Sequence, residues 1–93
     1  VEKSMKKSEV IKIFKALGNE RRFLILKHIL EKRELTVSQV SELISLSFKS
    51  TSRHLLVLKN ANLVVSRQTD LNNFYSLNNE FMKEFNKFLK LSS

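Results

Sequence analysis

From residue 5 to residue 60 the apolar residues recur with the period of an α-helix, and from Leu63 to Leu77 that period is lost. The helical part divides into segments 5–17, 20–32, 37–44 and 48–60. Residues 63–69 and 74–77 are short and rich in β-forming residues, and residues 70–73 between them contain Asp and Asn, as a hairpin turn does. Helical spacing returns over 79–91. The sequence therefore predicts a mostly α fold with a small β-hairpin (α+β), in the order α-α-α-α-β-β-α.

Helix boundaries are predicted from capping residues, because the chain has no proline and a single glycine. Gly18 follows the first helix, where a left-handed C-terminal residue is common. Thr36 and Gln39 fit a reciprocal capping box at the start of helix 37–44. The other helices after the first are expected to begin at a side-chain N-cap, namely Asn19, Ser47 and Asn78.

Each helix carries an apolar face that is expected to be buried. On the first two helices the predicted inward residues are Met5, Val10, Ile13, Phe14, Leu17, Phe23, Leu26, Ile29 and Leu30. On the next two they are Val37, Val40, Leu43, Ile44, Phe48, Thr51, Leu55 and Leu58.

The formal net charge is +8, which favours a polyanionic partner such as nucleic acid. Ten Lys or Arg and four Glu lie within residues 1–33, so most of the excess charge precedes residue 34. Solvated helix faces are the alternative explanation for many of these lysines.

The chain has no cysteine, no Gly-rich phosphate loop and no arrangement of Ser, His and Asp that fits a catalytic triad. We therefore expect no enzymatic activity and no cofactor. No segment has the features of a signal peptide or the length of a membrane span. We expect a single domain over residues 1–93, a cytoplasmic location and no membrane partner.

Two short helices that are separated by residues 45–47 and followed by a hairpin form the layout of a winged helix-turn-helix domain. In such a pair the second helix enters the major groove of double-stranded DNA with its N-terminal residues. Lys49, Ser52 and Arg53 share one face of helix 48–60, and Ser50 lies beside them. Arg and Lys can bond guanine O6 and N7. The alternative is that this face is only the solvated side of an amphipathic helix.

Several separated segments resemble the ArsR/SmtB family of winged-helix regulators. The run from Phe14 to Leu26 resembles the opening signature of that family, and the run from Leu35 to Leu43 resembles its first helix-turn-helix element. Ser52-Arg53-His54-Leu55, with Leu58 and Asn62-Leu63-Val64, resembles the recognition helix and the entry into the wing. The resemblance covers roughly residues 10–78.

The resemblance implies a homodimeric transcriptional repressor that a signal releases from its operator. Because a two-fold dimer presents two copies of helix 48–60 about one helical turn apart, the operator is expected to be an imperfect palindrome. The resemblance places Lys49, Ser52 and Arg53 at base edges, puts Phe48 at a position often held by Gln, and assigns Arg67 and residues 70–73 to the wing. Phe48 could touch thymine methyl groups or close the core, and the sequence leaves both open. The full predicted DNA-binding set is Thr36, Phe48, Lys49, Ser50, Ser52, Arg53 and Arg67.

The same resemblance implies that helices 5–17 and 79–91 form the dimer. Large apolar residues on a terminal helix of so short a chain also favour a shared interface, although they could instead cap the core of one protomer. The predicted dimerisation residues are Met5, Val10, Phe81, Met82, Phe85, Phe88 and Leu89.

The chain departs from the metal sensors of that family, which use Cys on the first helix-turn-helix element or Asp and His on the last helix. No Cys occurs anywhere, and residues 79–91 contain neither Asp nor His. His28 and His54 are the only histidines, and His54 is expected to hydrogen-bond near the junction of helix and hairpin. We therefore expect no metal and no thiol response, and the sequence does not identify an effector.

Two further departures motivate another reading of the same fold. The predicted wing tip carries Asp70 and no basic residue, and Leu56 lies where a polar residue is common. A winged-helix protein-interaction module, or a non-specific architectural DNA binder, is therefore the alternative function.

Overall fold

The computed structural model describes residues 5–92, except for the side chains of residues 85, 86 and 88–92. The elements are α1 (Lys7–Leu17), α2 (Glu20–Lys32), β1 (Glu34–Thr36), α3 (Val37–Ile44), α4 (Phe48–Asn60), β2 (Val64–Gln68), β3 (Asn73–Leu77) and α5 (Asn79–Ser92). The fold is mostly helical with one small sheet, which confirms the predicted fold class. The first helix begins at Lys7, so Met5 precedes it.

The sheet has three antiparallel strands in the order β1-β3-β2. The predicted hairpin forms β2 and β3, but β1 was not expected from the sequence. Its central residue Leu35 is buried and pairs with Tyr75 of β3, so this short strand joins the hairpin to the helices. Three residues are too few to show an alternating pattern, which explains why no strand was predicted there.

The predicted N-caps are confirmed. The Thr36 hydroxyl accepts a hydrogen bond from the Gln39 backbone N–H at 3.2 Å, and the Gln39 amide oxygen accepts one from the Thr36 N–H at 2.8 Å. Asn19, Ser47 and Asn78 each accept a hydrogen bond from the backbone N–H three residues later. These contacts satisfy donors that a helix N-terminus would otherwise leave unpaired.

The expectation for Gly18 is wrong, because its φ of −75° and ψ of 30° lie outside the left-handed region. The next residue, Asn19, is extended and caps α2. The turn between α1 and α2 therefore has no positive φ at either residue. Among the described residues, a positive φ occurs instead at three residues with side chains, Arg33, Ser45 and Asn62.

The core lies between the helices and the inner face of the sheet. Its most completely buried side chains are Ile13, Ile25, Ile29, Val40, Thr51, Leu55, Leu58, Leu63 and Val64. Five residues expected to face inward are exposed instead, namely Phe14, Phe23, Leu30, Leu43 and Phe48. A chain of this size buries a narrow strip of each helix, and the apolar stripes of the helices are wider than that strip.

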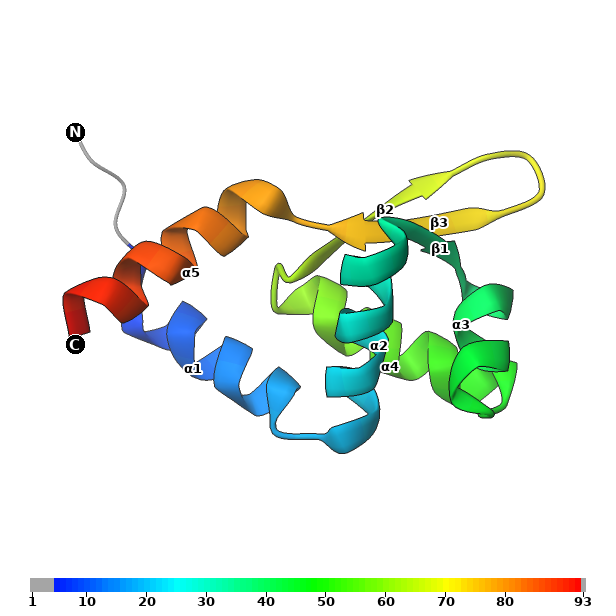
Figure 1. Cartoon of the computed structure of the whole chain (residues 1–93), viewed down its shortest axis with the longest axis horizontal. Helices are drawn as coiled ribbons and strands as arrows, with labels where there is room; N and C mark the ends of the chain where they lie inside the picture. Colours follow the sequence, from blue (N-terminus) through cyan, green and yellow to red (C-terminus); the bar gives the residue numbers. More distant parts are fainter. Residues whose placement is uncertain (1–4, 93) are drawn as a thin grey trace.

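The elements are distributed between two ends of the molecule (Figure 1). Helices α1 and α5 lie at one end, and the hairpin projects at the other end, on the side where α3 turns into α4. Among the described residues, none of the helices is long and apolar enough to cross a membrane.

Two adjacent leucines of α4 test this packing. Leu55 is fully buried, whereas Leu56 is 53% exposed. We expect Leu55→Ala to lower the free energy of unfolding by about 2–5 kcal/mol, because it opens a cavity in the core. The matched control, Leu56→Ala, should change it by about 0.5 kcal/mol or less. Urea unfolding followed by circular dichroism measures both, and equal losses would contradict the orientation of α4.

Candidate nucleic-acid interface

Helix α4 has one fully buried face and one exposed face, which carries polar residues in its first half and includes Leu56 further along. Thr51, Leu55 and Leu58 are completely buried and hold the helix against the core. Lys49 and Arg53 are exposed on the other side. Ser50 and Ser52 are half-buried at its margins. The structure therefore makes the predicted base-reading residues accessible, and their contact with bases stays a prediction.

Phe48 opens this helix with 58% of its surface exposed. Of the two roles the sequence left open, closure of the core is wrong, because the ring does not pack inside. An exposed aromatic ring at the N-terminal end of a recognition helix is suited to contact thymine methyl groups.

The hairpin of β2 and β3 forms the predicted wing. A groove of about 240 Å³ lies between the start of α3, the start of α4 and this wing. The wing contributes the polar side chains of Gln68, Asn72 and Asn73 together with Leu71, and the helices contribute Thr36, Val37, Ser38 and Phe48. The N-terminal turns of α3 and α4 contain no acidic residue, which suits them to approach phosphate groups. The segments expected to meet DNA thus converge on one edge of the molecule.

Thr36 lies at that edge, but it is buried and its hydroxyl caps α3. This arrangement gives Thr36 a structural role and disfavours a direct phosphate contact. The other six predicted contact residues have side chains that are exposed or half-buried.

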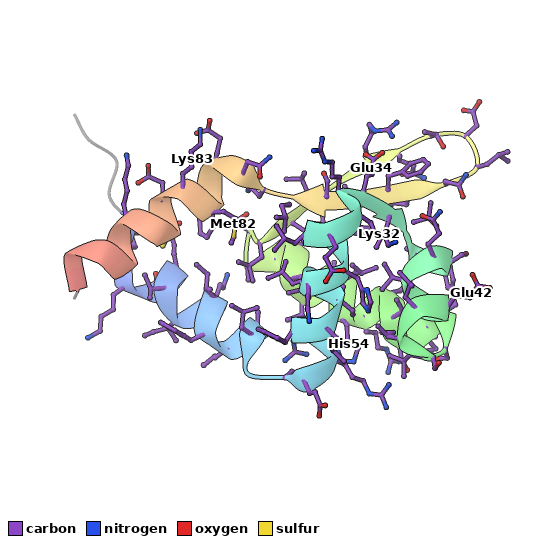
Figure 2. All side chains as sticks on the ribbon, in the orientation of Figure 1. Lys32, Glu34, Glu42, His54, Met82 and Lys83 are labelled. Carbon is purple, nitrogen blue, oxygen red and sulfur yellow. The ribbon has the colours of Figure 1, made fainter. Side chains whose placement is uncertain are left out.

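Arg67 of β2 is exposed but already engaged. Its guanidinium forms an ion pair with Glu34 of β1, with Nη2 2.9 Å from Oε1. Its Cζ atom lies 4.7 Å from the centre of the Phe74 ring on β3. Glu34, which Figure 2 labels beside the strands, was not recognised from the sequence as part of the wing.

A second contact that the sequence did not predict links α4 to α1 and α2. The Arg22 side chain donates from Nε to the carbonyl oxygen of Ala16 at 2.7 Å, and its Nη1 lies 3.3 Å from Nδ1 of His54. The expected partner of His54 near the hairpin junction is therefore wrong, because its partner Arg22 is on α2. For Nδ1 to accept this hydrogen bond the imidazole must be neutral.

The residues predicted to form a dimer differ in accessibility. Val10 is buried within the protomer, so it supports α1 from inside. Met5, Phe81 and Met82 are half-buried and pack against the core. The side chains of the remaining three lie outside the described residues, namely Phe85, Phe88 and Leu89. Ile11, which was not predicted, is 45% exposed on α1.

Within the part of the chain that the structure describes, no three His, Cys, Asp or Glu side chains are grouped closely enough to hold a metal ion. His28 and His54 thus share no such cluster with other ligands among these residues.

Comparison with known proteins adds to this geometry. The model of the arsR family of bacterial regulatory proteins matches residues 19–66. An uncharacterised HTH-type transcriptional regulator of Methanocaldococcus jannaschii is 31% identical over 84 residues, which span 90% of this chain and 94% of the relative. The transcriptional activator HlyU of Vibrio cholerae is 34% identical over 76 residues, 82% of this chain and 69% of that protein.

A solved structure shows the same architecture. It is the homodimeric winged helix-turn-helix DNA-binding domain of a possible ArsR-family transcriptional regulator from Mycobacterium bovis. The TM-score is 0.75 at 25% identity, and the match covers 91% of this chain and 78% of the other. The fold therefore has a solved counterpart.

The contact between His54 and Arg22 predicts how stability depends on pH. Burial, and then the charges of Arg22 and Arg21, lower the pKa of His54 below the ordinary value of 6.5. Below pH 6.5 the unfolded state therefore binds more protons at His54 than the folded state does. The contribution of neutral His54 to the free energy of unfolding is complete above pH 6.5 and is lost as the pH falls below it. We expect His54→Gln to flatten the decline in melting temperature between about pH 7 and pH 5.

His28→Gln is the matched control, because it removes the other histidine and keeps His54 with its partner. This variant should retain the decline of the parent protein. If His54→Gln and the parent lost melting temperature equally as the pH fell, the contact would not control the pH dependence.

Proposed function

Because the chain belongs to the ArsR family of bacterial regulatory proteins, which are DNA-binding transcriptional regulators, we propose that it is a homodimeric repressor of an imperfect palindrome. One observation carries the proposal: α4 buries one face completely while Lys49 and Arg53 remain exposed on the other. A helix held in this way can present a fixed row of donors to the major groove.

Within that groove we assign base contacts to Arg53 and Lys49 and supporting contacts to Ser50 and Ser52. Arg can donate two hydrogen bonds to guanine, whereas serine hydroxyls bond either bases or phosphate. Phe48 is assigned to thymine methyl groups, since its exposed ring precedes these residues on the same helix.

The proposed dimer is formed through α1 and α5. These helices lie at the end of the molecule away from the wing (Figure 1). A second copy joined there leaves the reading edge, where α3, α4 and the wing meet, free in both protomers. The similar domain from Mycobacterium bovis is homodimeric. A two-fold dimer would present its α4 helices to major grooves about 34 Å apart, and the matching operator would be an imperfect palindrome.

We propose repression because a dimer that occupies a promoter excludes polymerase from it without any further contact. HlyU, a similar protein, is a transcriptional activator. The sign of regulation is therefore tested separately from DNA binding, by transcription in vitro from the bound promoter. An increase in transcript on adding the protein would overturn repression and leave DNA recognition intact.

We also propose that the regulator responds to neither metal ions nor thiol oxidation. The whole sequence contains no cysteine, which excludes thiolate ligands and disulfide switches. Nδ1 of His54 already has a partner in Arg22. A metal site would need three or four converging ligands. We also propose that the chain is not an enzyme, and its similarity to transcriptional regulators supports this.

Arg53 provides the test of base reading. An operator is first selected by the protein from randomised duplexes, and affinity is then measured at several salt concentrations. We expect Arg53→Ala to weaken binding to that operator by about 1–3 kcal/mol and to relax base preference at one position in each half-site. Binding to an unrelated duplex should change little by comparison.

Arg53→Lys is the conservative control, because it keeps the charge and loses the planar fork that pairs with guanine. It should bind unrelated DNA like the parent and still lose base preference. If Arg53→Ala weakened all sequences equally, Arg53 would be a phosphate contact. If no common sequence emerged from the selection, specific recognition itself would be rejected.

Ile11 provides the test of the dimer. Its side chain is 45% exposed in the protomer, so Ile11→Lys should fold normally yet place a charge in the proposed α1 and α5 interface. We expect the dimer dissociation constant to rise at least about tenfold in sedimentation equilibrium, because an unpaired charge would be buried. Leu43→Lys on α3, where Leu43 is 44% exposed, is the matched control and should leave the dimer unchanged. Equal behaviour of the two variants would rule out this interface.

A further inference from the structure

The ion pair between Arg67 and Glu34 spans the width of the sheet. Arg67 is on β2 and Glu34 is on β1, with β3 between them. Nη2 of Arg67 lies 2.9 Å from one carboxylate oxygen, and Nε lies 3.4 Å from the other. The Phe74 ring of β3 lies 4.7 Å from the guanidinium carbon. One edge of the guanidinium therefore contacts a carboxylate, and the ring supports its position.

This pair determines the charge of the wing. Arg67 is the only basic residue in the sequence from Leu63 to Asn78, and Asp70 is the only acidic one. When Glu34 of β1 is included, the charges of Arg67, Asp70 and Glu34 sum to −1. A phosphate that approached the paired guanidinium would also approach the Glu34 carboxylate, and the two interactions would oppose each other.

We propose that Glu34 is an internal competitor of the DNA backbone, and that the wing contacts a phosphate when Arg67 leaves Glu34 for it. This inference rests on the proposed function as a DNA-binding regulator. It makes Glu34, which the resemblance did not identify, a residue that sets DNA affinity, although it need not touch the DNA.

The exposure of the pair favours exchange of partner over a permanent support. The side chains are 60% and 39% exposed, and such surface pairs contribute little free energy, so separating them costs little. Phosphate and carboxylate both accept paired hydrogen bonds from a guanidinium, so one can replace the other. The contact with Phe74 can persist during the exchange, because the Phe74 ring offers no hydrogen-bond acceptor that competes for the ion-pair donors, and Cζ lies 4.7 Å from its centre.

The exchange has a specific signature in salt dependence. In both the parent protein and Glu34→Gln, Arg67 neutralises one phosphate once it is bound, but in the parent it must first leave Glu34. Arg67→Gln removes this phosphate contact. Each neutralised phosphate contributes about −0.9 to the slope of log affinity against log salt.

The experiment is a double-mutant cycle of Glu34→Gln and Arg67→Gln in the full chain, measured on the operator selected by the parent protein. We expect Glu34→Gln to bind roughly two- to tenfold more tightly at low salt with a nearly unchanged slope, and Arg67→Gln to show a slope shallower by about one. In the Arg67→Gln background the same change should have little effect. Thermal unfolding of each variant establishes that it is folded.

Asp70→Asn is the matched control, because it removes another negative charge from the wing. Any increase in DNA affinity caused by Asp70→Asn should persist in the Arg67→Gln background, because it would arise from the lower negative charge of the wing and not from Arg67. The cycle thus separates competition for one arginine from simple loss of negative charge.

Two results would overturn the inference while the proposed function stands. Weaker binding by Glu34→Gln would show that the carboxylate holds Arg67 in place for DNA. A gain of equal size in the Arg67→Gln background would show that Glu34 acts only by its charge. If the parent protein selected no operator, the proposed function would fail first, and this inference with it.

Discussion

The geometry of the candidate interface depends on the burial of one face of α4. Thr51, Leu55 and Leu58 are fully enclosed, and together they fix the rotation of the helix about its axis. Since successive residues of a helix are rotated by a constant angle, the direction of Lys49 and Arg53 follows from that burial. The same burial stabilises the helix, because the packing of an apolar face contributes more to a helix in a protein than intrinsic propensity does.

The sequence predicted those features that depend on interactions between near neighbours in the chain. The capping box of Thr36 and Gln39 joins residues three positions apart, and its two hydrogen bonds form as expected. The bounds of α2, α3 and α4 follow from such caps together with the helical period. β1 could not be predicted in this way, because it exists only through pairing with β3, which lies far along the chain.

Two other kinds of feature lacked a local signal. Phe23, Leu30 and Phe48 continue the apolar stripes of their helices, yet a thin core has no room for them. The pairs of Arg22 with His54 and of Arg67 with Glu34 join residues 32 and 33 positions apart. In the sequence, Arg67 and Glu34 each look like an ordinary surface residue. Only the tertiary fold reveals that they are paired.

These pairs change how the net charge of +8 is to be understood. The lysines of α1 lie at the end of the molecule away from the wing, and the longest dimension of the molecule is 40 Å (Figure 1). At physiological salt a charge acts over about 8 Å, so these lysines add little to binding at the reading edge. The charge of Arg67 is balanced by Glu34. The exposed cations in the first half of α4 are Lys49 and Arg53.

A protomer that makes few contacts with DNA would bind weakly. Joining two protomers compensates, because the second half-site is then bound at high effective concentration. The charge pattern thus supports the proposed dimer independently of any apolar surface.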